Sequence, residues 1–153
     1  QNRTPAAPPP SGPEYLLVDG YNVIFAWDEL KKIAAENLDA ARRRLMDILC
    51  NYAGYRKCVP ILVFDAYRVK GAGREQETWH NLHVIYTREA ETADMFIERV
   101  THELAKNHRV RVVSSDGAEQ IIILGNGALR VSARAFEREV RAVEAEIREF
   151  LDQ

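Results

Sequence analysis

Short apolar runs alternate with longer amphipathic stretches along most of this chain. Three of the runs cover residues 15–18, 60–64 and 110–113, and each is rich in Val, Leu and Ile. Continuous apolar runs of this length are typical of parallel strands that are buried on both faces. Two weaker runs, at 82–86 and 129–131, predict further short strands. Strands that alternate with helices predict an α/β fold with three layers, a central parallel sheet flanked by helices and joined by right-handed crossovers.

Apolar residues that recur every three or four positions predict the helices between these strands. The longest covers residues 38–58, a second covers 93–107, and a third follows Ser132, which we expect to cap it. A further helix is expected over 118–124, where Gly125-Asn126-Gly127 would end it. Residues 20–22 are expected to form a tight loop, and the polar stretch 67–80 is expected to be a longer one.

The first thirteen residues differ in kind from the rest, because they include five prolines. Such a segment favours polyproline II or disorder and cannot form a core. We therefore expect residues 1–13 to be a linker or disordered arm and residues 14–153 to be one domain. The chain starts at Gln rather than Met, so the arm is either an expression remnant or a linker from a longer protein. The proline content favours the linker.

Composition excludes several classes of protein. The net charge of −2 gives no global attraction to nucleic acid, so any such partner needs a local basic patch. The sequence contains no run resembling a signal peptide or a transmembrane span. Its two cysteines, Cys50 and Cys58, lack zinc-site spacing and favour a reducing compartment. We therefore expect a cytoplasmic protein with no membrane association.

Three aspartates give the most direct indication of chemistry. Asp19, Asp65 and Asp116 each close one of the three principal apolar runs. In open α/β sheets, ligands bind outside the carboxyl ends of the strands, so these side chains are expected to meet. Two carboxylates ~4 Å apart repel by about 4 kcal/mol at an effective dielectric of ~20. A hard divalent cation removes that repulsion, and Mg²⁺ and Mn²⁺ both prefer carboxylate oxygens.

Further acids lie near the start of the helix expected at residue 93. Asp94 is interpreted as a fourth ligand, because the three strand-end aspartates already predict a metal site. Glu98 is interpreted as a solvated residue, since acids near a helix start also favour the helix dipole. Ser115, with Ser114, would cap a helix or orient Asp116. Asn22 would either hold a loop through an Asx turn or contact a phosphate, and both interpretations stay open.

Four acids with no histidine in the same motifs indicate a metal-activated water. Two metals held by shared carboxylates would activate the water and stabilise the leaving oxygen of a phosphodiester. A single metal with a carboxylate general base is the lesser version. The candidate catalytic and metal-binding residues are therefore Asp19, Asp94, Asp65 and Asp116.

Basic residues next to these acids predict the substrate side of the site. Arg68, Lys70 and Arg74 follow Asp65 in a loop with two glycines, which would let a phosphate backbone approach closely. Arg88 and Arg130 would extend this patch. The competing interpretation is that the loop is simply solvated. We take Asn22, Arg68, Lys70, Arg74, Arg88, Arg130 and Ser115 as the candidate substrate-binding residues.

Five motifs in order resemble those of the YacP-like NYN nucleases, within the PIN-like endoribonucleases. They are Leu16–Asn22, Val63–Ala66, Tyr86–Asp94, Ser115-Asp116 with Glu119-Gln120, and Gly127–Arg134. The resemblance covers nearly all of the chain beyond the proline-rich arm. It implies a PIN-like domain in which Asp19 and Asp94 are the principal metal-binding acids and Asp65 and Asp116 complete the pocket.

The resemblance also implies a substrate and a context. The expected activity is Mg²⁺- or Mn²⁺-dependent hydrolysis of single-stranded RNA or mRNA, in association with the ribosome. Some members of the family are the C-terminal part of translation-factor-like proteins, and the proline-rich arm would suit such a fusion. This chain ends just after its last helix, without the basic tail that some relatives carry.

Two alternatives compete with an endoribonuclease. The first is a non-catalytic RNA- or ribosome-binding module of the same fold, which four intact acids argue against. The second is a Mg²⁺-dependent phosphatase or receiver domain. A phosphatase of the haloacid type needs a second aspartate two residues after the first, where this chain has Tyr21.

Overall fold

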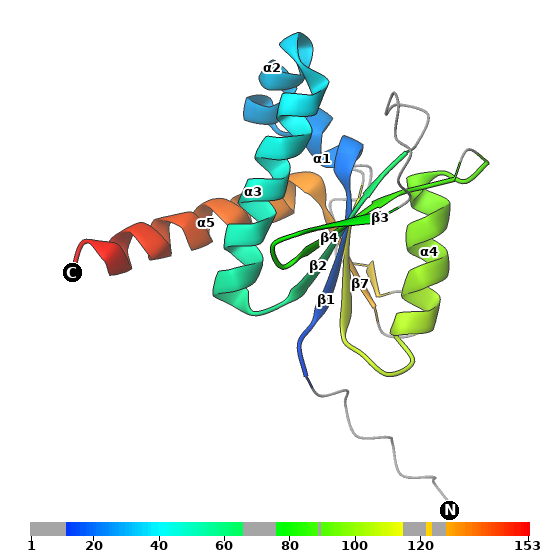
Figure 1. The fold of residues 1–153 in the computed structure, drawn as a ribbon. Helices are drawn as coiled ribbons and strands as arrows, with labels where there is room; N and C mark the ends of the chain where they lie inside the picture. The colour runs from blue at the N-terminus through cyan, green and yellow to red at the C-terminus, as the bar shows by residue number, and fades with distance from the viewer. Residues whose placement is uncertain (1–11, 66–75, 89, 115–121, 124–127) are drawn as a thin grey trace, which may run out of the picture.

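The computed structural model describes residues 12–65, 76–88, 90–114, 122–123 and 128–153. Within them, seven strands form one sheet in the order β3-β4-β2-β1-β5-β7-β6 (Figure 1). Neighbouring strands from β4 to β7 are parallel, whereas β3 and β6 join the two edges antiparallel. The α/β fold with a central, mainly parallel sheet is therefore confirmed. The strands are β1 Tyr15–Asp19, β2 Val59–Phe64, β3 Gln76–Trp79, β4 Leu82–Tyr86, β5 Val110–Ser114, β6 Ile122–Ile123 and β7 Leu129–Ser132.

Strand β1 lies at the centre of the sheet and explains why its sequence is apolar without interruption. Leu16 and Val18 face one core and Leu17 faces the other, and all three are fully buried. A strand covered on both faces cannot alternate apolar with polar side chains. The apolar run before Asp19 is therefore the signature of a central strand.

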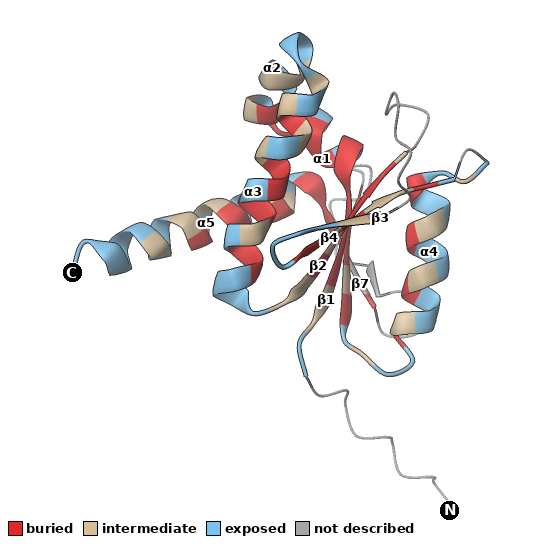
Figure 2. Cartoon of the chain, in the orientation of Figure 1, coloured by how far each residue is buried: buried red, intermediate tan, exposed pale blue. Residues whose placement is uncertain are grey.

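Helices cover both faces of the sheet and make the three expected layers (Figure 1). Four of them, α1, α2, α3 and α5, lie on one face, and α4 lies on the other. Figure 2 shows the buried residues of α3 and α4 turned toward the strands, whereas α2 packs against α1 and α3. The helices are α1 Gly20–Ala26, α2 Asp28–Glu36, α3 Leu38–Arg56, α4 Ala93–Leu104 and α5 Ala133–Leu151.

Side-chain caps fix where the helices begin. Ser132 accepts a hydrogen bond from the Ala135 amide at 3.1 Å at the start of α5, as its sequence predicts. Thr92 accepts one from Met95 at the start of α4, also at 3.1 Å. Each bond satisfies an amide that has no partner within its own helix.

Three local expectations differ from the structure. Residues 20–22 do not form a loop, because α1 begins at Gly20 directly after β1. The end of the expected loop at 67–80 is strand β3, which pairs antiparallel with β4 at the sheet edge and needs no apolar run. Ile122–Ile123 are strand rather than helix, since these β-branched residues pair with β7. The remainder of both segments lies outside the described residues, as does the arm at 1–11.

Arg111, near the amino end of β5, ties four elements together. Its guanidinium donates to both carboxylate oxygens of Glu139 on α5, at 2.9 and 2.7 Å, and to the Tyr52 hydroxyl on α3 at 2.8 Å. Its Nε lies 3.2 Å from the carboxylate of Glu14, just before β1. The side chain is only 16% exposed. This cluster closes the end of the sheet opposite to the strand-end aspartates.

Among the described residues, no helix has both the length and the apolar character needed to cross a membrane.

Candidate active site

Asp19 ends β1 and is at the same time the N-cap of α1. Its carboxylate is almost fully buried, with the residue 5% exposed. The Asn22 side-chain amide donates to Oδ2 at 2.6 Å, and the Asn22 backbone amide lies 3.5 Å from Oδ1. Asn22 therefore holds Asp19 in a fixed orientation. Whether Asn22 also meets a phosphate stays a prediction.

Gly20 allows the chain to turn into α1 directly beneath this carboxylate. A Cβ atom at this position would overlap the aromatic ring of Phe64, which is fully buried at the end of β2. Because the ring has no room to move, a side chain at position 20 would push α1 away from the sheet. The glycine thus keeps Asp19 close to the end of β2.

Asp65 follows β2 and connects it to α4. Its Oδ1 accepts a hydrogen bond from the Ala93 backbone amide at 2.6 Å, at the first residue of the helix. The Thr87 amide donates to the Phe64 carbonyl at 3.0 Å, which holds the end of β4 against β2. Asp94, the next residue of α4, is exposed. The bond from Asp65 therefore places the carboxylate of Asp94 relative to the sheet.

Electrostatics shows that the three described aspartates share one region. Burial is the main cause that raises the pKa of Asp19, and the hydrogen bonds from Asn22 oppose it. The carboxylates of Asp65 and Asp94 raise that pKa further by repulsion. Asp116 and Ser115 lie outside the described residues, as do Arg68, Lys70 and Arg74.

The two described arginines of the predicted substrate side flank these acids. Arg130 on β7 donates to the Ser114 hydroxyl at 2.9 Å, at the carboxyl end of β5. Arg88 comes just after β4. In the sheet, β4 and β7 lie on opposite sides of β1, so Arg88 and Arg130 are on opposite sides of the central strand. The acids at the ends of β1 and β2 therefore lie between two sources of positive charge.

The donor atoms suit a hard divalent cation. Carboxylate oxygens that repel one another, one of them buried, are what Mg²⁺ or Mn²⁺ binds in proteins. The residues that would hold it are Asp19 and Asp94, with Asp65 beside them. Within the described part of the chain, no group of three His, Cys, Asp or Glu side chains is close enough to hold a metal by itself. The fourth predicted ligand, Asp116, falls outside that part.

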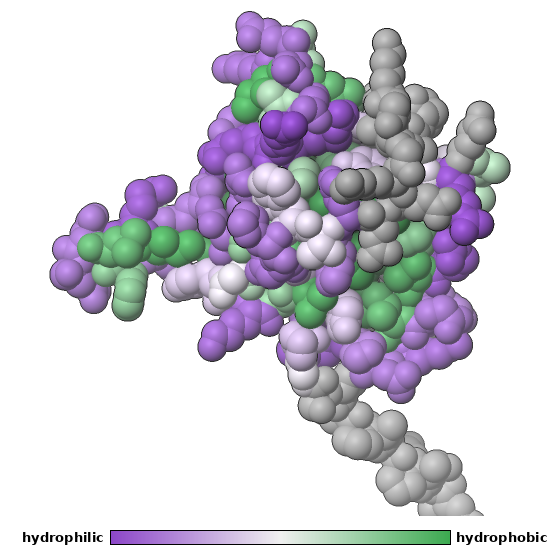
Figure 3. Space-filling model, viewed as in Figure 1, coloured by the Kyte–Doolittle hydropathy of each residue, from purple (hydrophilic) through white to green (hydrophobic). Residues whose placement is uncertain are grey.

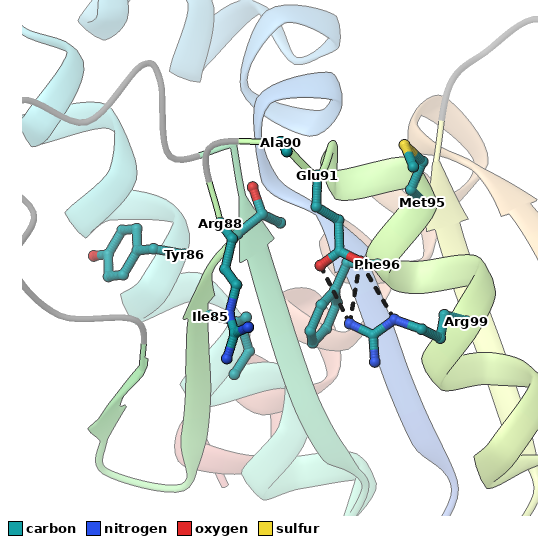
Figure 4. Close-up of a pocket in the computed structure, with 9 residues that line it drawn as sticks. Ile85, Tyr86, Arg88, Ala90, Glu91, Met95, Phe96 and Arg99 are labelled. Atoms are coloured by element: carbon teal, nitrogen blue, oxygen red, sulfur yellow. Dashed lines mark hydrogen bonds and ion pairs between the residues drawn. The ribbon is translucent and has the colours of Figure 1, made fainter.

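Sequence reasoning missed a hollow between the end of β4 and the first turns of α4 (Figure 4). Its volume is about 620 Å³. Of its lining residues only Arg88 is a candidate site residue from the sequence, whereas Met95, Phe96 and Arg99 are not. The available signal was spacing, because Met95 and Arg99 are four residues apart and share one face of a helix. The residues that line it are Ile85, Tyr86, Thr87, Arg88, Ala90, Glu91, Met95, Phe96 and Arg99.

The arrangement of acids at strand ends agrees with the comparison to protein families. Residues 16–153 match the family described as the YacP-like NYN domain. The chain belongs to this family. The predicted resemblance is thereby confirmed, and the YacP-like NYN domain is a family of PIN-like nucleases.

One sequence match and two solved structures agree with membership of the YacP-like NYN family. It is 44% identical to the YacP protein of Bacillus subtilis (strain 168) over 135 residues, which cover 88% of this chain and 79% of that protein. The crystal structure of Rae1 (YacP) from Bacillus subtilis matches with a TM-score of 0.75 at 42% identity, covering 90% of this chain and 79% of that one. A single-substitution variant of the same protein matches with a TM-score of 0.71 at 40% identity, covering 88% and 79%.

Proposed function

We propose that this chain is a metal-dependent endoribonuclease that hydrolyses RNA phosphodiester bonds. The observation that supports this most is the grouping of Asp19, Asp65 and Asp94 at the carboxyl ends of β1 and β2 and the start of α4. The mutual repulsion of these acids raises the electrostatic energy of the folded protein, and a bound cation would remove it. Membership of a PIN-like nuclease family, whose members generally use divalent metals, supports the same activity.

The residues divide the work as follows. Asp19, Asp94 and Asp65 would hold the cation, with Asp116 as the proposed fourth ligand. When bound, Mg²⁺ or Mn²⁺ activates a water and stabilises the leaving oxygen of the phosphodiester. Asn22 keeps the Asp19 carboxylate oriented through its 2.6 Å hydrogen bond. Asp65 sets the position of α4, and with it that of Asp94.

The substrate proposed is single-stranded RNA, including mRNA. Arg88 and Arg130 flank the acids and would contact phosphates, which fixes the position of the strand without reading its sequence. Arg68, Lys70 and Arg74 would extend this contact, with Ser115 and Asn22 nearest to the acids. We also propose that the chain acts on mRNA at the ribosome, in the cytoplasm, as the C-terminal part of a translation-factor-like protein. This context is supported by the family resemblance and by the proline-rich arm.

One experiment tests the activity. A short labelled single-stranded RNA is incubated with the protein in Mg²⁺, in Mn²⁺ or in EDTA, and the products are separated on a gel. We expect cleavage with either metal and none in EDTA. Asp94→Asn should lower the rate by at least a hundredfold, because it removes a metal-binding charge from a centre on which the chemistry depends.

Asp47→Asn is the matched control, since Asp47 is exposed on α3. It should cleave like the unaltered chain. Cleavage by Asp94→Asn at the normal rate would disprove the assignment of this residue. RNA binding without any cleavage would instead favour the non-catalytic binding module.

A further inference from the structure

We propose that the hollow between β4 and α4 binds one unpaired nucleotide of the RNA, the one next to the bond that is cut. The inference rests on the proposed function for the position of that bond. It assigns a role to residues that lie outside the cluster of acids, chiefly Met95, Phe96 and Arg99.

Residues that line the hollow are neighbours in sequence of the acid Asp94, since Glu91 and Met95 lie on either side of it. Described residues between β4 and α4, among them Thr87, Arg88 and Glu91, line the hollow, and hydrogen bonds hold Thr87 and Ala93 in place. Thr87 is hydrogen-bonded to the end of β2 at 3.0 Å, and Ala93 is hydrogen-bonded to Asp65 at 2.6 Å. Asp94 follows at once. An RNA strand with a phosphate at the acids therefore meets this hollow with an adjoining nucleotide.

The walls combine apolar surface with positive charge. Ile85 of β4 lines the hollow together with Phe96 and Met95 of α4, and Met95 is 54% exposed. Figure 3 shows apolar surface gathered between the sheet edge and α4. A nucleobase presents flat apolar faces, and stacking on such surface tolerates any base.

The charges are arranged for a phosphate. Arg88 and Arg99 both line the hollow, and among the described lining residues the one carboxylate is that of Glu91. Glu91 accepts from Arg99 through both oxygens, at 3.2 to 3.3 Å, and the guanidinium lies 5.2 Å from the centre of the Phe96 ring. The pair with Glu91 holds the Arg99 guanidinium over the Phe96 ring, and Arg88 lies on the other side of Phe96 in Figure 4. Such an arrangement suits a base next to a phosphate.

The volume of the hollow limits which ligands can bind in it. A volume of about 620 Å³ lies within the ~300–1,000 Å³ of small-molecule sites, so a nucleotide fits and a helix of RNA does not. A base that is stacked and paired in a duplex cannot enter a hollow of this kind. The geometry therefore favours single-stranded over double-stranded RNA.

The test measures binding rather than cleavage. A fluorescent single-stranded oligouridylate is titrated with the protein in EDTA, and its anisotropy gives the affinity. The same oligonucleotide is then made with one abasic residue at each position in turn. The protein is used unaltered, as Met95→Glu, and as the matched control Phe150→Glu. Phe150 is also an exposed apolar residue, 72% exposed near the end of α5.

We expect one abasic position to weaken binding to the unaltered chain about tenfold, the loss of one stacked base. Met95→Glu should weaken binding of the intact oligonucleotide by at least that factor, and the abasic residue should then have no further effect. Phe150→Glu should behave like the unaltered chain. Circular dichroism checks that each variant is folded.

Independent effects of the abasic residue and of Met95→Glu would overturn the proposal, and so would the absence of either effect. Neither result depends on cleavage, so the proposed nuclease activity is judged separately. If the protein cleaves RNA but the effects of the abasic residue and of Met95→Glu are independent, only the nucleotide site is refuted. If the two effects are coupled but the protein does not cleave RNA, only the proposed nuclease activity is refuted. Where both hold, the sensitive position should adjoin the cleaved bond.

Discussion

At the scale of single residues, Asp19 shows how the site opposes the stability of the fold. Its carboxylate is 5% exposed and lies near two other carboxylates, so the charged form is disfavoured and its pKa is raised. A raised pKa of an acid means that the folded state is more stable below the ordinary pKa and loses stability as the pH rises. At neutral pH without metal, Asp19 therefore destabilises the protein.

We predict that Asp19→Asn raises the melting temperature in EDTA at neutral pH, because it removes the buried charge and keeps the shape. With a divalent metal the order should reverse. A ligand at a hundred times its dissociation constant stabilises by about 2.7 kcal/mol, and only the unaltered chain should gain this. Thermal melts of both proteins in EDTA and in Mn²⁺ measure the effect. A lower melting temperature for the variant in EDTA would contradict the argument.

Cys58, just beyond α3, allows a prediction on pH. Burial raises the pKa of the Cys58 thiol to about 11, and the Glu14 carboxylate adds to the effect. Because the folded state favours the neutral thiol, its contribution to stability is lost as the pH rises from about 9 to about 11. In a Cys50→Ser variant, the rate of alkylation by iodoacetamide should keep rising toward pH 11. The unfolded chain is the control, and its rate should level off near pH 9. The same profile in both states would refute a buried thiol.

At the scale of elements, α4 depends on a side chain that belongs to another part of the chain. Asp65 accepts from the first amide of α4, in addition to the ordinary cap at Thr92. Asp65→Ala should lower the free energy of unfolding by about 1 kcal/mol, as the loss of a capping residue does. Asp65→Asn keeps an oxygen acceptor and should restore most of that loss. Urea denaturation of the three proteins measures the difference. Equal stability of the two variants would show that the bond does not matter.

The sequence predicts a structural feature well when the residues that form it are close together in the chain, and poorly when they are far apart. The apolar runs before Asp19 and Asp65 predicted the central strands, because only a strand covered on both faces has that pattern. Ser132 as a cap was predictable, since the bond spans three residues. The role of Asp65 toward Ala93 was not, because it joins residues far apart in the chain. The hollow was missed for the same reason: Ile85 and Phe96 meet only after β4 and α4 have packed.

At the scale of the whole molecule, the two ends of the sheet carry groups of charged residues with opposite effects on stability. The carboxyl ends of β1 and β2 carry the repelling acids, and the amino end is closed by the Arg111 cluster. The cluster joins β5 to α3, α5 and the segment before β1, through bonds of 2.7 to 3.2 Å. Stability lost at one end is thus offset at the other.

Arg111→Ala should lower the free energy of unfolding by about 2 kcal/mol, because it leaves two partly buried carboxylates and the Tyr52 hydroxyl without their partner. Arg138→Ala is the control, since Arg138 is exposed on α5. Urea denaturation measures both. The folded fraction of Arg111→Ala should cleave RNA at the normal rate, because the cluster is at the far end of the sheet. A loss of stability no greater than that of the control would show that the cluster contributes little.

The central position of β1 determines when, during synthesis and folding, the proposed active site can form. Tyr15 pairs with Val59 on one side and with Val110 on the other, so the central strand can be enclosed only after segments much further along the chain have been synthesised. Pairings between such distant segments form slowly compared with helices. Asp19 therefore emerges long before the residues that surround it. The proposed active site is therefore complete only after β5 has taken its place beside β1.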